Sequence, residues 1–481
     1  MNTEKLKLGE FSMLLASDLD DGRSVYLNGK KLDSPSKEPI FIKTLSYVNA
    51  YYRLQQTHPE THMYAEDGQQ YDIVFKTPHT IQDLTAKRCV YQDIAIQSYG
   101  MLGRTPDFID SGIPAFAAHT KFLGCNKYAN FSSNADSYCA RIKQSDVFVS
   151  HALQNPQIDR SKELHEVTKG ATGMKASKVT NEGIYVSGAK MVNTLAPLSN
   201  ELLIFNTPTL APGDEDYALA FWLPINSDGL SIICRKPFNR PDHSEFDYPL
   251  SNAFDEIDAY IIFEDVFIPW SDVFVFQDVE KSNQFFTESG LFQHTTLQDQ
   301  ARGSVKLEFV TSLAIELAQR LGVDKYLNVQ EMLGNLTANL ELVRGALVNS
   351  ELTGSMDDRG VFGPNLQPLL AIRAQLPKMY ELALTTIQKL GAGSMMGVPD
   401  GRDFDGKLGH VLDEMMSSTL MSAEYRAKLL NLSWDVSGES FGQRQLMYEY
   451  YHGGDPVRIR AQHYHSEDLH IGDAMLKRIL K

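Results

Sequence analysis

The chain has 481 residues, of which 43% are hydrophobic and 22% are charged, an ordinary composition for a folded globular protein. This length predicts two or three packed units, and the composition excludes disordered and fibrous proteins. The formal net charge is −16, from 61 acidic and 45 basic side chains, so the sequence does not indicate nucleic-acid binding.

The sequence carries no signal for a membrane or for an oxidising compartment. No segment approaches 18 uninterrupted apolar residues, and residues 1–15 mix lysines and glutamates with short apolar patches. The four cysteines lie far apart, without a metal-ligand spacing: Cys89, Cys125, Cys139 and Cys234. We therefore expect a soluble, cytoplasmic protein with reduced structural thiols and no metal.

The first 278 residues predict a mixed region followed by a β-rich region. Helices are expected over residues 42–55 and 84–99. Residues 178–204 surround an Asn181-Glu182-Gly183 turn and predict a hairpin, and the segments 218–223 and 230–234 around a second turn predict another. The run 259–276 is interrupted by Pro269, which predicts two strands in place of one.

The C-terminal third predicts a helical bundle. Four stripes of apolar residues recur with a helical period, over residues 307–321, 333–347, 372–390 and 412–430. Four such helices can bury their stripes against one another. The predicted division is a mainly helical domain (1–147), a β domain (148–278) and a helical bundle with a tail (279–481).

The common nucleotide-binding and hydrolase motifs are absent from the sequence. No phosphate-binding G-x-x-x-x-G-K-[ST] loop occurs, and the glycines of residues 391–397 follow a helical stripe with the last glycine one residue late. The G-x-S-x-G string at 438–442 also follows a helical stripe, where a turn is the better interpretation than a nucleophile elbow.

Two segments combine turn-forming residues with groups suited to catalysis. In residues 103–108, Pro106 and Asp107 fit a turn that presents Arg104 to an anionic oxygen, although a local Arg–Asp pair explains the same pattern. In residues 150–160, His151 is able to exchange a proton near neutral pH, although a buried histidine before a capped turn is the alternative.

Two further segments, residues 188–197 and 444–458, are polar or rich in tyrosine and can equally be plain structure. Together, the four segments resemble the 4-hydroxyphenylacetate 3-hydroxylase large-component family, whose relatives also act on chlorophenols and nitrophenols. Other strings extend the resemblance over almost the whole chain: residues 21–26, 254–256, 262–270 and 306–309.

The resemblance implies a fold, an activity and partners. The expected fold is α+β and acyl-CoA-dehydrogenase-like, with an N-terminal helical domain, a central β-barrel and a C-terminal four-helix bundle that assembles into a homotetramer. The expected activity is ortho hydroxylation of a phenol, free or carrier-tethered, through a flavin C4a-hydroperoxide formed from FADH2 and O2. A separate flavin reductase is expected to supply the reduced FAD.

The resemblance also implies which residues contact the substrate. Arg104 and His151 resemble the residues that hold the phenolic oxygen, and Thr207 resembles a position in the substrate pocket. His294 is an alternative base, as in some chlorophenol-acting relatives. The family often has a tyrosine where this chain has Phe108, so one hydrogen bond is lost and 4-hydroxyphenylacetate is not the expected substrate.

A second set of residues is expected to contact the flavin. Thr194 resembles the residue whose hydroxyl lies beside the flavin N5, and His151 is expected to contact the flavin as well as the substrate. The remaining positions implied by the resemblance are Gln157, Ile158, Asp159, Arg160, Gly453, Gly454, Asp455 and Pro456. Two alternatives stay open: a flavin-dependent dehydrogenase or oxidase of the acyl-CoA dehydrogenase type, and a catalytically silent scaffold.

Overall fold

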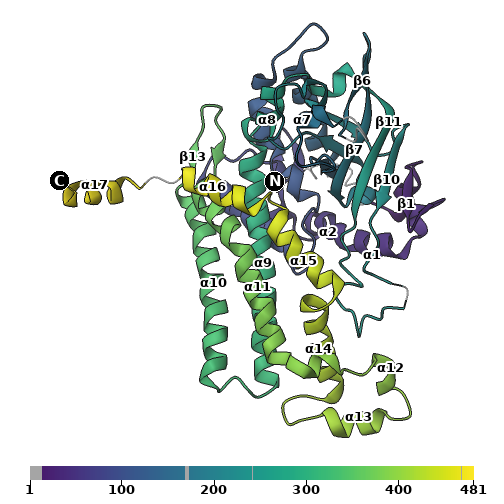
Figure 1. Cartoon of the computed structure of the whole chain (residues 1–481), viewed down its shortest axis with the longest axis vertical. Helices are drawn as coiled ribbons and strands as arrows, with labels where there is room; N and C mark the ends of the chain where they lie inside the picture. The colour runs from purple at the N-terminus through teal and green to yellow at the C-terminus, as the bar shows by residue number, and fades with distance from the viewer. Residues whose placement is uncertain (1–13, 168–172, 241, 467–468, 481) are drawn as a thin grey trace, which may run out of the picture. The chain divides into compact units, whose positions relative to one another are not determined.

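A computed structural model describes residues 14–167, 173–240, 242–466 and 469–480 (Figure 1). The chain divides into two compact units. Unit 1 comprises the residues up to Lys306 together with Ser355–Gly363, and unit 2 comprises Leu307–Gly354 and Pro364 onwards. Within the described ranges, no helix combines the length and the apolar character needed to cross a bilayer.

Unit 1 combines helices with β-sheets. Its helices are α1 (Pro39–Val48), α2 (Ala50–Thr57), α3 (Pro59–His62), α4 (Ile81–Ile96), α5 (Asp107–Asp110), α6 (Ile113–His119), α7 (Phe131–Ser145), α8 (Val279–Glu288) and the first half of α9 (Leu291–Arg320). The helix predicted over 84–99 is confirmed as α4. The helix predicted over 42–55 is instead two helices, because Asn49 separates α1 from α2, and the Asn49 side chain forms hydrogen bonds with the backbone of Leu14.

The β-structure of unit 1 consists mainly of two sheets. The larger has the order β2 (Lys30–Lys31), β1 (Val25–Leu27), β10 (Leu230–Cys234), β11 (Asp258–Pro269), β7 (Gly183–Thr194), β6 (Lys175–Val179) (Figure 1). The smaller has the order β12 (Val273–Phe276), β9 (Leu219–Pro224), β8 (Glu201–Ile204), β5 (Val149–Ala152). Two short hairpins complete the set: β3 (Met63–Glu66) with β4 (Gln69–Asp72), and β13 (Ser355–Met356) with β14 (Phe362–Gly363).

The expected central β-barrel is wrong, because the described strands form open sheets. The edge strands of the larger sheet explain why it does not close. β2 is two exposed lysines, and β6 is five residues long with Lys175, Lys178 and an exposed C-terminal half. Short, charged edge strands resist pairing with a further strand.

The two predicted hairpins have different outcomes. The β6–β7 hairpin is confirmed, with Lys175 opposite Ser187 and Val179 opposite Ile184. The β9–β10 hairpin is wrong, because β9 pairs with β8 and β12 whereas β10 pairs with β1 and β11. Side chains of β9 are buried on both faces, while those of β10 alternate between buried and exposed, so each strand suits a different sheet. The break expected at Pro269 is confirmed, since β11 and β12 lie in different sheets.

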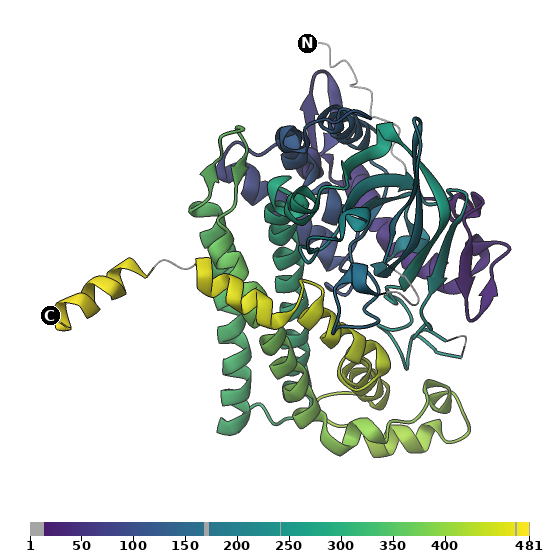
Figure 2. The same ribbon diagram turned by 45° about the horizontal axis from the view of Figure 1, so that its top comes forward.

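Unit 2 is helical. It contains the second half of α9, then α10 (Leu327–Leu352), α11 (Leu366–Gly391), α12 (Gly401–Phe404), α13 (Gly409–Met416), α14 (Ala423–Ser437), α15 (Ser440–Tyr451), α16 (Pro456–Ser466) and α17 (His470–Ile479). α10 and α11 lie side by side (Figures 1 and 2), and Arg344 on α10 forms an ion pair with Glu308 on α9 at 2.8 Å.

Three of the four predicted helical stripes are confirmed, and the fourth is wrong. The expected helix over 412–430 is broken between Met416 and Ala423, and Leu420 is 46% exposed. Serine hydroxyls explain the break, because Ser417 bonds the Asp413 carboxylate and Ser422 accepts a hydrogen bond from the Tyr425 N–H as the cap of α14. Such local bonds compete with continued helix.

A polar cluster in unit 1 joins α2, β4 and the end of α7. Gln55 Nε2 donates to Asp72 Oδ2 at 2.5 Å and to Asp146 Oδ2 at 2.9 Å, and the Tyr51 hydroxyl donates to Asp146 Oδ1 at 3.0 Å. Burial raises the pKa of Asp146 to about 7 and raises the pKa of Asp72 well above its usual value. The folded protein therefore holds protons here that the unfolded chain releases.

We predict that Asp146→Asn gains stability relative to the wild type as the pH rises from 4 to 7. The folded Asp146 titrates near pH 7 and the unfolded one near its usual, lower pKa, so the wild type loses stability between these two values. Asparagine is a permanent neutral analogue and tolerates the left-handed backbone, φ 46°, of this position. Urea unfolding followed by fluorescence across the pH range measures the difference.

Asp67→Asn is the matched control, because Asp67 is exposed and also left-handed, with φ 49°. Its difference from the wild type is expected to be the same at every pH. A constant difference for Asp146→Asn would show that the buried carboxyl is ionised throughout.

Candidate active site

The turn that carries Arg104 is held by a buried glutamate. Glu256 Oε1 accepts hydrogen bonds from the backbone N–H of Gly103 at 2.6 Å and of Arg104 at 2.8 Å. The Arg104 guanidinium, itself buried, donates to Gly103 O and lies 3.7 Å from Asp299 Oδ1. Asp107 does not form the local pair considered above; it accepts a hydrogen bond from Gln298 at 2.7 Å.

Asp299 is shared between two arginines. Arg302 Nη2 lies 3.4 Å from Asp299 Oδ1 and Arg302 Nη1 donates to Gly100 O at 3.0 Å. Both arginines and the aspartate are nearly inaccessible to solvent. The network fixes the position of the Arg104 charge, because charged groups in such surroundings are held by their partners.

The structure brings Arg104, Phe108 and His151 together. Arg104 Cζ lies 3.9 Å above the centroid of the Phe108 ring, and the His151 imidazole also lies beside that ring, at 5.0 Å between centroids. Phe108 is the second residue of α5, and His151 lies in β5, paired in parallel with Leu203 of β8. A cation, an aromatic ring and a titratable base therefore adjoin one another.

His151 is neutral at physiological pH in this environment. Burial lowers the pKa of its imidazole well below the usual value, and the nearby Arg104 charge lowers it further. The lowered pKa leaves this imidazole able to accept a hydrogen bond and also makes it a weak base, while the adjacent guanidinium is able to stabilise a negative oxygen. The group has the composition of a site that binds a weak acid and stabilises its anion.

Thr194 lies at the end of β7, just after an irregularity in the pairing with β11. The register shifts between the Ala259–Asn193 and Ile261–Lys190 pairs, and Val192 adopts φ 57° while 57% exposed. A β-branched residue in this region of φ is strained, and β-bulges of this kind redirect side chains beside functional sites. Ser150, the neighbour of His151, donates its hydroxyl to Thr194 O at 3.0 Å.

Lys190 connects the end of β5 with the segment that precedes Thr207. Its Nζ donates to Leu153 O at 3.0 Å and to Asn206 Oδ1 at 2.7 Å, and burial lowers the pKa of this lysine to about 7. Thr207 itself is only partly buried, and its hydroxyl lies 3.3 Å from that of Thr209. The predicted substrate contact of Thr207 stays a prediction.

The segment predicted to hold the flavin is mostly exposed. Gln157, Ile158 and Arg160 are exposed, whereas Asp159 accepts hydrogen bonds from Ser161 N at 3.0 Å and from Ser161 Oγ at 2.6 Å. These bonds lower the pKa of Asp159. Just before them, Asn155 Oδ1 is buried and has no hydrogen-bond partner among the described residues. A buried oxygen of this kind is able to accept a hydrogen bond from a bound molecule.

The other predicted flavin segment lies in unit 2. Gly453, Gly454 and Asp455 form the turn between α15 and α16, and Gly454 adopts φ 111°. Asp455 Oδ1 accepts hydrogen bonds from the backbone N–H of Val457 and of Arg458, which caps the helix that begins at Pro456. The turn is confirmed, and its flavin contact stays a prediction.

His294, the alternative base, has different neighbours from His151. It is buried near the start of α9, where burial lowers its pKa to about 3, with smaller effects from Lys87 and His119. Its backbone N–H donates to Gly290 O at 3.4 Å. Its role as a base stays a prediction, whereas the geometry around Arg104 favours His151.

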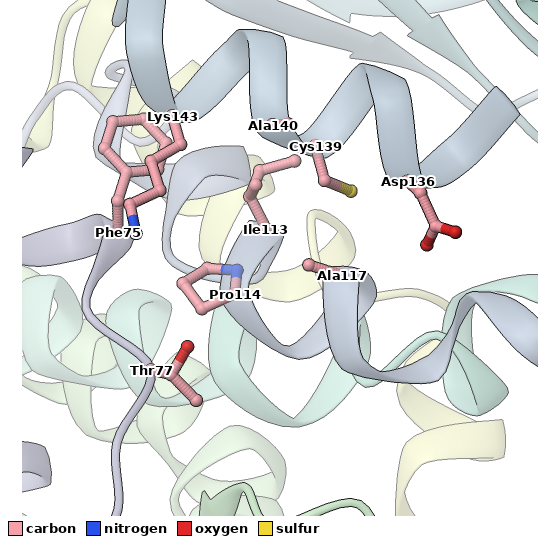
Figure 3. Close-up of a pocket in the computed structure, with 9 residues that line it drawn as sticks. All are labelled: Phe75, Thr77, Ile113, Pro114, Ala117, Asp136, Cys139, Ala140 and Lys143. Carbon is pink, nitrogen blue, oxygen red and sulfur yellow. The ribbon is translucent and has the colours of Figure 1, made fainter. Parts of the chain in front are cut away.

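A cavity of about 290 Å³ lies elsewhere in unit 1, between α6 and α7 (Figure 3). Its lining residues are Phe75, Thr77, Ile113, Pro114, Ala117, Asp136, Cys139, Ala140 and Lys143. None of these nine residues belongs to the predicted site.

Sequence reasoning missed the residues that hold the site together. Glu256, Asp299, Lys190 and Asp258 were given no role, although Glu256 lies in a string that carried the resemblance. The useful signal was the acidic run Asp255-Glu256-Ile257-Asp258 at the start of a predicted strand, where buried carboxylates need partners.

Known protein families and relatives match nearly the whole chain. Two family profiles, described as 4-hydroxyphenylacetate 3-hydroxylase N terminal and C terminal, match residues 16–275 and 282–481. The 4-hydroxyphenylacetate 3-monooxygenase oxygenase component of Thermus thermophilus is 32% identical over 91% of this chain and 90% of that protein.

Solved structures agree as well. The oxygenase component of 4-hydroxyphenylacetate 3-monooxygenase, complexed with FAD and 4-hydroxyphenylacetate, matches with a TM-score of 0.91 and 30% identity over 98% of this chain and 97% of that one. A glutaryl-coenzyme A dehydrogenase complex matches with a TM-score of 0.50 and 11% identity over 88% of this chain and 94% of that one. At this low identity, the match shows a likeness of fold alone. The acyl-CoA-dehydrogenase-like fold is therefore confirmed, and the chain belongs to the 4-hydroxyphenylacetate 3-hydroxylase family.

Proposed function

We propose that this protein is the oxygenase component of a two-component, FADH2-dependent monooxygenase that hydroxylates a phenol next to its hydroxyl group. The observation that carries the proposal is the Arg104–Phe108–His151 group, with a guanidinium 3.9 Å above a ring that also adjoins a neutral imidazole. Relatives named as oxygenase components and structures solved with FAD and 4-hydroxyphenylacetate support it.

The chain's part in the reaction is to convert a phenol into a better nucleophile. His151 draws or shares the phenolic proton at its neutral imidazole, and Arg104 compensates for the weak basicity of this imidazole by stabilising the oxygen that becomes negative. Glu256 fixes the backbone of the turn that carries Arg104, and Asp299 lies beside its guanidinium, so little reorganisation is needed when charge develops. Deprotonation makes the ring carbon ortho to the oxygen electron-rich.

The described residues fit an FAD cofactor. Asn155 Oδ1 is buried and lacks a hydrogen-bond partner within the described part of the chain, and the exposed Gln157 and Arg160 side chains that follow offer donors for flavin and phosphate oxygens. Bound reduced FAD, with O2, supplies the electrophilic oxygen that the ring receives. Residues 157–160, Thr194, His151 and residues 453–456 would hold it, and the chain contributes by orienting the substrate and excluding water.

Partners and assembly form the second part of the proposal. A separate flavin reductase supplies FADH2, and the chain assembles as a homotetramer in the cytoplasm, with the three domains given above. Support for assembly comes from apolar side chains left exposed on α10, such as Leu327 at 80%, Leu342 at 66% and Leu352 at 60%. Sedimentation and cell fractionation test these points.

The substrate is expected to be a phenol other than 4-hydroxyphenylacetate. Phe108 offers no hydroxyl to the phenolic oxygen, so Arg104 and His151 carry its recognition. A missing hydrogen bond to a buried oxygen costs on the order of 1 kcal/mol. A phenol that is bulkier or differently oriented, free or attached to a carrier protein, avoids this cost.

We predict that the protein, supplied with chemically reduced FAD and labelled O2, transfers one labelled oxygen atom to a phenol. Mass spectrometry of the products from a panel of phenols identifies the substrate and the position of the new hydroxyl. Arg104→Ala and His151→Ala are each expected to reduce turnover by roughly 100-fold or more, because each removes a group that stabilises the reacting phenolate.

The same experiment separates the alternatives. Flavin reduction by an acyl-CoA, without oxygen transfer to any phenol, would indicate the dehydrogenase or oxidase. Absence of FAD binding in both redox states would indicate the silent scaffold. Turnover unchanged in both variants would show that the Arg104–His151 group is not the site.

We predict that Phe108→Tyr lowers the KM for 4-hydroxyphenylacetate about fivefold, because a hydroxyl on this ring restores a hydrogen bond of about 1 kcal/mol. The ligand-free variant is expected to unfold at a lower temperature, since the added hydroxyl is buried without a partner until the phenol binds. Steady-state kinetics and thermal unfolding measure the two effects.

Phe267→Tyr serves as the control, because Phe267 lies on β11 and is 41% exposed. Its KM and thermal stability are expected to match the wild type. An unchanged KM in a correctly folded Phe108→Tyr variant would mean that the ring does not face the phenolic oxygen.

A further inference from the structure

The Thr194 hydroxyl belongs to a chain of hydrogen bonds that leads away from the predicted flavin position. Thr194 Oγ1 donates to Asp258 Oδ1 at 2.7 Å, and Arg235 Nε donates to Asp258 Oδ2 at 3.1 Å. Thr194 is 7% exposed, and the Asp258 side chain is 16% exposed. The three residues come from β7, the start of β11 and the segment after β10.

The direction of these hydrogen bonds follows from the chemistry of the groups. An ionised carboxylate only accepts hydrogen bonds, and a guanidinium only donates them. The single hydroxyl hydrogen of Thr194 is therefore committed to Asp258. What remains on the Thr194 oxygen is its lone pairs, so this oxygen acts towards a neighbour as an acceptor.

Arg235 keeps Asp258 in this orientation. Its Nη2 donates to Asp255 Oδ1 at 2.6 Å and to Glu256 O at 2.9 Å, while its backbone N–H donates to Asp258 O at 2.9 Å. A charge-assisted network with this many bonds opposes rotation of the carboxylate. The Thr194 backbone is held as well, since its carbonyl accepts the Ser150 hydroxyl at 3.0 Å.

We propose that Asp258, oriented by Arg235, is a positioning residue that makes Thr194 a hydrogen-bond acceptor and thereby selects reduced over oxidised FAD. Reduced flavin carries a hydrogen on N5, whereas oxidised flavin carries a lone pair there. An acceptor beside N5 bonds the first and repels the second. The inference rests on the proposed function and on the family resemblance, which implies that the flavin N5 lies beside Thr194.

This arrangement suits an oxygenase that receives its flavin from another protein. Such a protein must bind the reduced form when it arrives and release the oxidised form after turnover. One hydroxyl with a fixed direction favours both events, because its contribution to the binding free energy of FAD is favourable when N5 carries a hydrogen and unfavourable when N5 carries a lone pair.

The test compares the Kd of oxidised and of reduced FAD, measured without oxygen. The wild type is expected to bind reduced FAD more tightly. In Asp258→Asn the Arg235 N–H still requires an acceptor, so the amide oxygen faces Arg235 and the amide NH2 faces Thr194. The Thr194 hydroxyl then turns outward as a donor, and the ratio of oxidised to reduced Kd is expected to fall at least tenfold.

A tenfold change in this ratio corresponds to about 30 mV in the midpoint potential of bound FAD for a two-electron couple. The potential of FAD bound to Asp258→Asn is expected to be lower than that of the wild type by at least this amount. Potentiometric titration measures it without any turnover.

Control variants separate the effect of hydrogen-bond direction at Thr194 from a general effect of the substitution on the structure. Asp265→Asn is the matched control, because Asp265 also lies on β11 and accepts hydrogen bonds from the hydroxyls of Ser187 at 2.7 Å and Ser177 at 3.0 Å. Asp265 is exposed, and its variant is expected to keep the wild-type ratio of oxidised to reduced Kd. Thr194→Ser keeps the hydroxyl and is expected to keep the preference. Thr194→Val removes it and is expected to lose the preference.

The outcomes distinguish the inference from the function on which it rests. A folded Asp258→Asn protein with the wild-type ratio overturns the inference, even if phenol hydroxylation is observed. If Asp258→Asn does not fold, a preference that persists in Thr194→Val overturns it instead. Failure of the wild type to bind FAD in either redox state overturns the proposed function.

Discussion

Four consecutive residues, Asp255–Asp258, hold the parts of the candidate site in unit 1. The Asp255 carboxylate fixes Arg235, the Glu256 carboxylate fixes the Arg104 turn, and the Asp258 carboxylate orients Thr194. The fourth residue contributes its backbone, since Ile257 O accepts the Leu195 N–H at 2.8 Å. Buried carboxylates with several N–H donors are rigid anchors, so groups distant in sequence meet with little freedom.

Local sequence patterns predicted most helices and strands correctly, but they did not predict correctly which strands pair with one another. Helical periodicity placed α4 and three long helices of the C-terminal third, and Pro269 correctly divided two strands. The β9–β10 error arose because a turn between two strands does not reveal which sheet each will join. That choice depends on whether one or both faces are covered, which other parts of the chain decide. The false helix over 412–430 arose because serine caps outweighed an apolar period.

The sequence proposed site residues only where a side chain's own chemistry suits catalysis. Arg104, His151 and Thr194 were proposed from their motifs, and the structure brings Arg104 and His151 to the same phenylalanine ring. The groups that orient them, such as Asp299 and Lys190, act through contacts distant in sequence and match no local pattern. Their positions become apparent only when burial shows which charges need partners.

The strand order of the larger sheet also governs how the chain can fold during synthesis. Val25 of β1 pairs in parallel with Ile232 of β10, and β10 in turn lies beside β11, which ends at Pro269. The first strand made therefore has no neighbour in its sheet beyond β2 until most of unit 1 has left the ribosome. Contacts of such long sequence range form slowly. At usual rates of protein synthesis, the apolar side chains of β1 therefore stay without their β10 partners for a time on the order of ten seconds.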